Sequence, residues 1–104
     1  MNFSIEINPH ADLDTLPPVK DVYVTMLPGG DYKETAQQSG ELVKKGFNPV
    51  PHFPARSIVD EAQLKDYISI CKDMGVEQAL VIGGSRDPIG KFDSSIQILE
   101  TGFF

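Results

Sequence analysis

The sequence is poor in cysteine, tryptophan and positive charge. It has one cysteine, no tryptophan, and nine lysines and arginines against fifteen acidic residues, for a net charge of -6. A single cysteine, Cys71, cannot form an internal disulfide, which favours a reducing, cytoplasmic compartment. The few cations are scattered, so we expect no nucleic acid partner and no docking on an anionic membrane.

Long apolar runs are also missing. No segment approaches the roughly 20 apolar residues that span a bilayer, and Met1 to Ile7 carry no basic leader, so we expect no membrane segment. Hydrophobic residues still make up 40% of the chain, and apolar and polar stretches alternate, as in a folded protein. A chain of 104 residues supports one modest core, so we expect residues 1–104 to form a single domain.

Four short segments have the composition and spacing of strands, and each ends at proline or glycine. The first alternates apolar and polar residues, and the second is β-branched. The third is interrupted by prolines, and the fourth is a continuous apolar run, typical of a strand buried on both faces of a parallel sheet. The expected strands are residues 3–7, 22–27, 50–53 and 79–82.

Apolar residues at helical spacing predict three helices between and after these strands. The first follows Asp31, a candidate N-cap, and ends near Gly46; the second begins at Asp60 and ends at Gly75; the third begins near Phe92. Residues 9–18 carry three prolines and predict an irregular link with at most one helical turn. The three apolar faces are Ala36, Gly40, Val43 and Phe47; Leu64, Ile68, Cys71 and Met74; and Ile96, Leu99 and Phe103.

This order predicts an α/β fold with about four parallel strands and right-handed crossover helices. A complete TIM-type β/α barrel has eight strands and about 250 residues, so the sequence predicts a partial barrel, its N-terminal half. A half-barrel has two open sheet edges and an uncovered apolar face. We therefore expect a homo-oligomer that is assembled through the sheet.

Polar groups stand at the strand ends, where the chemistry of parallel β/α folds is found. Glu6 ends the first strand, on the face opposite Ile5 and Ile7. If the apolar face meets the helices, Glu6 points into the barrel, where loss of water favours a protonated carboxyl that can act as a general acid. A solvent-facing glutamate at a sheet edge is an equally good interpretation of the pattern.

The other strand-end residues are individually ordinary. His52 alone is most simply a histidine hydrogen-bonded to backbone, and Thr25 is a common β-branched strand residue. Gly83-Gly84-Ser85 would let backbone amides approach a phosphate or a flat ring, but it also suits a tight turn. No cysteine or histidine cluster has metal-ligand spacing, so we expect no metal site.

The ordered set of strand ends resembles the flavin-dependent methylenetetrahydrofolate reductase family. The matching segments, in chain order, are Phe3-Ser4-Ile5-Glu6-Ile7-Asn8-Pro9, Val24-Thr25, Pro51-His52-Phe53, and Leu80-Val81-Ile82-Gly83-Gly84-Ser85-Arg86-Asp87-Pro88 with Gly90. This resemblance implies a β/α barrel that binds FAD, takes electrons from NADH or NADPH, and passes a hydride to its folate substrate, methylenetetrahydrofolate. It implies that Glu6 protonates the departing nitrogen and that Thr25, His52 and Ser85 lie at the flavin.

The chain departs from the family in two ways. The family has an aspartate after the Gly-Gly pair where this chain has Ser85, and the lost charge would weaken stabilisation of a cationic intermediate. The resemblance also covers only four strands, so we expect residues 1–104 alone to bind FAD weakly and to lack reductase activity.

Two other functions compete with the reductase. One is a non-catalytic β/α module that binds a small ligand or a partner. The other is an unrelated barrel enzyme such as an aldolase, which would need a strand-end lysine for a Schiff base. None of the expected strands ends in lysine.

Overall fold

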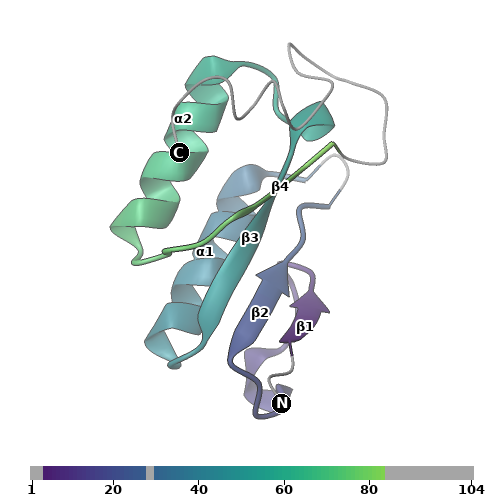
Figure 1. Ribbon diagram of the computed structural model, residues 1–104, viewed down its shortest axis with the longest axis vertical. Coiled ribbons are helices and arrows are strands. Elements are labelled where there is room, and N and C mark those ends of the chain that lie inside the picture. Colours follow the sequence, from purple (N-terminus) through teal and green to yellow (C-terminus); the bar gives the residue numbers. More distant parts are fainter. Residues whose placement is uncertain (1–3, 28–29, 84–104) are drawn as a thin grey trace.

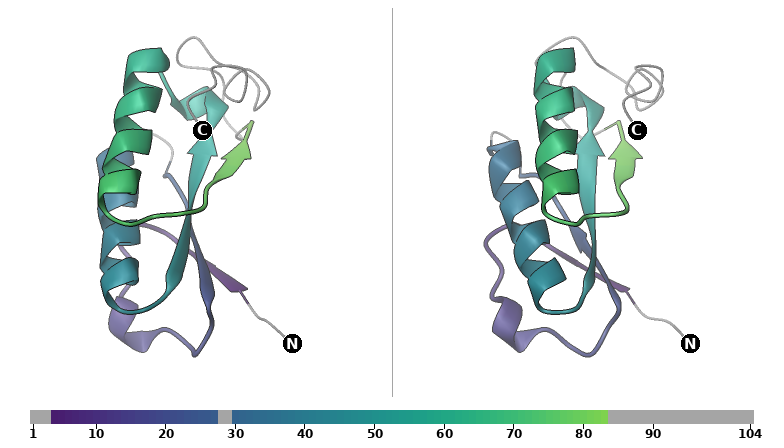
Figure 2. Two further views of the ribbon diagram at one scale, coloured as in Figure 1. Left: turned by 60° about the vertical axis from the view of Figure 1, so that its left-hand side comes forward. Right: turned by 90° about the vertical axis from the view of Figure 1, so that its left-hand side faces the viewer.

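A computed structural model describes residues 4–27 and 30–83, in which four parallel strands form one sheet in the order β1-β2-β3-β4 (Figure 1). The two α-helices of the described ranges lie on the same face of this sheet (Figure 2). The predicted α/β fold with four parallel strands and crossover helices is confirmed. The elements are β1 (Ser4–Ile7), η1 (Leu13–Thr15), β2 (Asp21–Val24), α1 (Tyr32–Lys44), β3 (Asn48–Pro54), η2 (Ala55–Ser57), α2 (Glu61–Asp73) and β4 (Leu80–Ile82).

The connection between β1 and β2 is the short link that its prolines predict. Its only helical structure is the single 3-10 turn η1, which begins after Asp12, whose carboxylate accepts a hydrogen bond from the Asp14 N–H. Two full crossover helices follow, each after an aspartate N-cap: Asp31 accepts from the Lys33 N–H and Asp60 from the Gln63 N–H. Such caps satisfy amide groups that the first helical turn leaves unpaired.

Strand β3 contains three prolines although it lies between two neighbours. The Asn48 N–H donates to the Lys20 carbonyl on the β2 side. Backbone groups alternate in direction along a strand, so the backbone nitrogens of Pro49 and Pro51 point toward the β4 side. Strand β4 pairs only with His52 to Pro54. The missing N–H groups of Pro49 and Pro51 therefore cost no hydrogen bond in the sheet, since no strand pairs with them on that side.

The core lies between the sheet and the helices. Its centre is the ring of Phe53 in β3, stacked on Tyr67 in α2 with centroids 3.9 Å apart. Both rings are almost completely buried, and burial of a large apolar side chain stabilises a fold by about 1.5–3 kcal/mol. A second cluster joins Ile5 and Ile7 of β1 to the buried valines of β2 and to Leu42 of α1.

The helix faces follow the predicted spacing with one shift. Ala36 and Gly40 are buried, but so are Thr35, Ser39 and Leu42, while Val43 and Phe47 are only half-buried. Leu42 packs on the buried valines of β2, and the Thr35 hydroxyl bonds the Thr25 carbonyl after β2. The two described helices meet at Gly40, where an added Cβ would lie 2.6 Å from the Met74 Sδ. Met74 itself is 38% exposed rather than buried with Leu64, Ile68 and Cys71.

Two strand predictions need correction. Strand β2 ends at Val24: Thr25 still donates its N–H to the Ile7 carbonyl, but its own carbonyl accepts from the Thr35 hydroxyl, and Met26 enters the core. Strand β4 was expected to be buried on both faces, but Leu80 is 37% exposed, because β4 is an edge strand of the described sheet. The helix expected from Phe92 lies outside the described residues. Neither described helix has the length and apolarity to cross a membrane.

Candidate functional site

The structure brings Glu6 and His52 together on the sheet face that the helices leave open. Ile5 and Ile7 pack on the helix side, so alternation turns Glu6 to the opposite face, as the sequence predicted. The Glu6 Oε2 atom lies 3.9 Å from the His52 Nε2 atom, although their strands are separated by β2. These two residues are 46 positions apart in the sequence and are the centre of the candidate site.

Tyr23 completes this cluster and was missed by the sequence analysis. It is the direct register partner of Glu6 in β2, and its ring lies edge-on to the His52 ring with centroids 6.2 Å apart. The available signal was alternation: Val22 and Val24 are buried against α1, so Tyr23 between them must face the other way. Tyr23 thus lies on the strand between those that carry Glu6 and His52.

His52 is held firmly and is poorly solvated. Only 10% of its side chain is exposed, and its backbone carbonyl accepts a 2.8 Å hydrogen bond from the buried Tyr67 hydroxyl of α2. Burial lowers the pKa of the His52 imidazole, and the nearby Glu6 charge opposes this effect. At neutral pH the ring is therefore mainly uncharged.

The His52 Nε2 atom is buried without a hydrogen-bond partner within residues 4–27 and 30–83. Buried polar atoms in proteins are normally hydrogen-bonded, so an unpaired one requires an explanation, such as a bound ligand or a functional role. The sequence interpretation of His52 as a histidine whose ring is satisfied by backbone does not account for this nitrogen. The Glu6 carboxylate lies 3.9 Å from it, beyond hydrogen-bond distance.

Glu6 is much more open to solvent than His52. Its side chain is 65% exposed, since β1 is an edge strand of the described sheet and has a neighbour on one side only. The partial loss of water that the sequence analysis expected around this carboxylate is not provided by the described residues. The same openness leaves the Glu6 side chain free to rotate toward His52 or toward a ligand.

Thr25 lies at the same end of the sheet, immediately after β2. Its N–H donates to the Ile7 carbonyl over 2.9 Å and its carbonyl accepts from Thr35, so its backbone is fixed between β1 and α1. No hydrogen bond joins its side chain to Glu6 or His52 in the described part of the chain. Ser85, the remaining predicted ligand of the flavin, lies outside the described residues.

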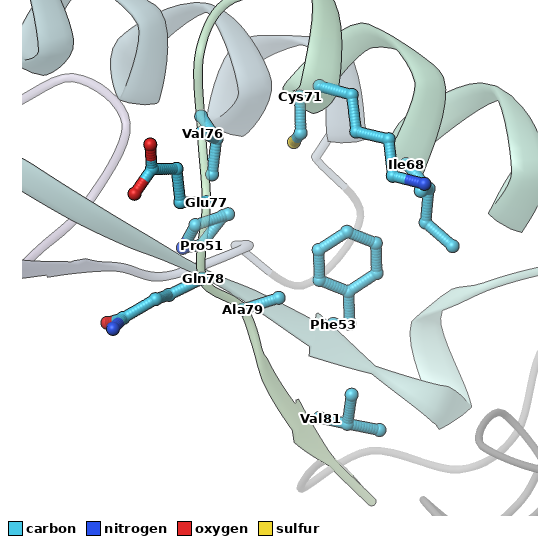
Figure 3. Close-up of a pocket in the computed structure, with 10 residues that line it drawn as sticks. Pro51, Phe53, Ile68, Cys71, Val76, Glu77, Gln78, Ala79 and Val81 are labelled. Atoms are coloured by element: carbon cyan, nitrogen blue, oxygen red, sulfur yellow. The ribbon is translucent and has the colours of Figure 1, made fainter. Parts of the chain in front are cut away.

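A separate cleft of about 350 Å³ lies on the helix side of the sheet, between α2, β3 and β4 (Figure 3). It opens where Pro51 prevents β4 from pairing with β3, and it contains none of the predicted site residues. Its lining is mainly apolar and lacks converging polar groups, so we assign it to packing and not to ligand chemistry. The lining residues are Pro51, Phe53, Ile68, Cys71, Lys72, Val76, Glu77, Gln78, Ala79 and Val81.

No model of a known protein family matches the chain. Within the ranges that the structure describes, no three histidine, cysteine or acidic side chains gather closely enough to hold a metal ion.

Proposed function

We propose that this chain supplies the first four strands of a methylenetetrahydrofolate reductase-like flavoprotein barrel. The observation that supports the proposal is the meeting of Glu6 and His52 on the open sheet face, with Oε2 and Nε2 3.9 Å apart. In a closed barrel this face is the interior, and groups near the carboxyl ends of the strands surround the substrate. The meeting of two residues that carry the family resemblance supports the proposal in this way.

The residues present fit a bound flavin. The His52 imidazole lies on the open sheet face with an unpaired ring nitrogen, and Thr25 offers a hydroxyl at the same end of the sheet. His52 and Thr25 would therefore help to hold FAD, with Ser85 added on the family resemblance. When bound, FAD would supply the hydride for methylenetetrahydrofolate, after its own reduction by NADH or NADPH.

The contribution of the chain itself is the handling of a proton. Glu6 is the only carboxylate of the described strands on the open face near the strand ends, since the other, Asp21, is the first residue of β2. In this proposal Glu6 gives its proton to the nitrogen that departs when the five-membered ring of the folate opens. General acid catalysis of this kind contributes about 100-fold to 10,000-fold to a rate.

The experiment joins residues 1–104 to the second half of a methylenetetrahydrofolate reductase barrel, which supplies strands five to eight. The purified chimera should be yellow with bound flavin and should reduce methylenetetrahydrofolate. Glu6→Gln should lower folate reduction by about 100-fold or more while reduction of the flavin by the nicotinamide continues. Glu41→Gln, an exchange of the same kind on α1, serves as the control.

A folded chimera that never takes up flavin would contradict the proposal, and so would near-normal folate turnover by Glu6→Gln. The second candidate is a non-catalytic β/α module that binds a small ligand or a partner. The 65% exposure of Glu6 and the presence of Ser85 in place of the family aspartate favour that candidate. A colourless, folded chimera would support it.

A further inference from the structure

The groups that face the His52 imidazole come from several elements and are mostly uncharged. From β1 it faces the Glu6 carboxylate, from β2 the Tyr23 ring, and from α2 the Tyr67 hydroxyl, which is bound to its backbone carbonyl. Strand β4 contributes Leu80, Val81 and Ile82, which carry no charge. Among the described residues, Glu6 is therefore the one charged group that faces the His52 imidazole.

The geometry of the two groups suits exchange of a proton. The 3.9 Å between the Glu6 Oε2 and His52 Nε2 atoms is longer than a hydrogen bond. One atom of a ligand could still contact both groups. A small rotation of the exposed Glu6 side chain would bring its carboxylate within hydrogen-bond distance of the His52 ring. The His52 Nε2 atom has no competing partner in residues 4–27 and 30–83. The Tyr23 ring lies against His52 from the neighbouring strand and limits its movement toward β2.

We propose that Glu6 and His52 form one proton-sharing pair, in which His52 is the positioning residue that restores the proton that Glu6 gives away. The reaction it serves is taken from the proposed function. The O–H bond of the Glu6 carboxyl breaks as an N–H bond forms on the ligand, which leaves a carboxylate. His52 first takes one proton from a hydronium ion of the solvent, which becomes water, and the resulting imidazolium passes its Nε2 proton to that carboxylate. Glu6 is then again protonated and the His52 ring again neutral, and the net change is one proton moved from solvent to the ligand.

Sharing a proton requires that the charge on Glu6 changes the protonation of His52. Two unit charges about 4 Å apart attract by about 1 kcal/mol even with the screening of bulk water, which corresponds to about fivefold in an equilibrium. Because Glu6 is exposed, water screens its charge, and the attraction between the two charges is taken at this lower limit. Removing the charge should lower the ratio of protonated to neutral His52 by about fivefold at a fixed pH.

The test is an NMR titration of the two imidazole rings in the 104-residue chain, without flavin or folate. The chain has two histidines, and His10, which pairs with Glu34 on the surface, is an internal reference. His52→Asn assigns the signals. Glu6→Gln should shift the His52 titration to lower pH, while the His10 titration stays unchanged.

Glu6→Asp moves the charge away by one methylene and should give a smaller shift in the same direction. If Glu6→Gln does not fold, the titration of Glu6→Asp tests the proposal in its place. Glu41→Gln should change neither histidine. An unchanged His52 titration in the folded Glu6 variants overturns the proton-sharing pair but leaves the reductase proposal standing. If the titration shows coupling but the chimera cannot reduce folate, the reductase proposal is overturned and the proton-sharing pair stands.

Discussion

Tyr67→Phe is expected to destabilise the fold through the loss of one oxygen atom. The Tyr67 hydroxyl donates to the His52 carbonyl in a fully buried position, 2.8 Å away. Strand β2 pairs with β3 only as far as Pro51, so the pairing with β2 does not extend to His52. Removing the donor leaves a buried carbonyl without its hydrogen bond, which costs about 1–3 kcal/mol.

The packing term should change little, because phenylalanine keeps the ring that stacks on Phe53. The expected loss is therefore that of the hydrogen bonds of the hydroxyl, to the His52 carbonyl and to the Thr35 side chain. For a domain of this size, each 1 kcal/mol lowers Tm by roughly 4–8 °C, so Tyr67→Phe should lower it by roughly 10 °C. Urea unfolding followed by circular dichroism gives the free energy, provided that the slope with denaturant is unchanged.

Tyr32→Phe is the matched control. The Tyr32 hydroxyl donates to Asp66 near the surface, and this bond raises the pKa of Tyr32 to about 12. Water can replace an exposed partner, so we expect a loss below about 1 kcal/mol. Equal losses in the two variants, or an unchanged stability of Tyr67→Phe, would refute the assignment of the Tyr67 bond as the buried anchor of His52.

Two further predictions concern reactivity and assembly. Burial raises the pKa of the Cys71 thiol to about 12, so a disulfide reagent should react slowly with the native chain and rapidly in urea; fast reaction in buffer would show that the thiol is ionised. The chain should self-associate through its open sheet, and Leu80→Lys on the edge strand should shift it toward monomer in light scattering, while Val59→Lys, at an exposed apolar residue outside the strands, should not. A stable monomer of the unaltered chain at micromolar concentration would contradict this.

Much of the fold could be predicted from local patterns. Alternation along residues 3–7 placed Glu6 opposite Ile5 and Ile7, and the aspartate caps marked both helix starts, because these signals depend on neighbours in the sequence. The end of β2 could not be predicted in this way. Thr25 is a good strand residue, but a hydroxyl ten positions away binds its carbonyl, and that competing partner is visible only in three dimensions.

The candidate site could likewise be predicted only in part. Glu6 and His52 were recognised as strand-end residues, yet their contact depends on the registers of two strand pairs, which the sequence does not specify. The unpaired His52 nitrogen is a property of packing, so no pattern could indicate it. Tyr23 was overlooked because a tyrosine between valines is typical of any strand.

The prolines of β3 also fix which neighbours this strand accepts. Along residues 48–51 it can offer hydrogen-bond donors only toward β2, so any strand on its other side must begin its pairing at His52. A strand that slid by two residues toward Pro49 would meet positions without an N–H group. The prolines therefore set the register in which β4 pairs with β3, and with it the position of Gly83 at the end of this pairing, where its carbonyl accepts from the Arg56 N–H.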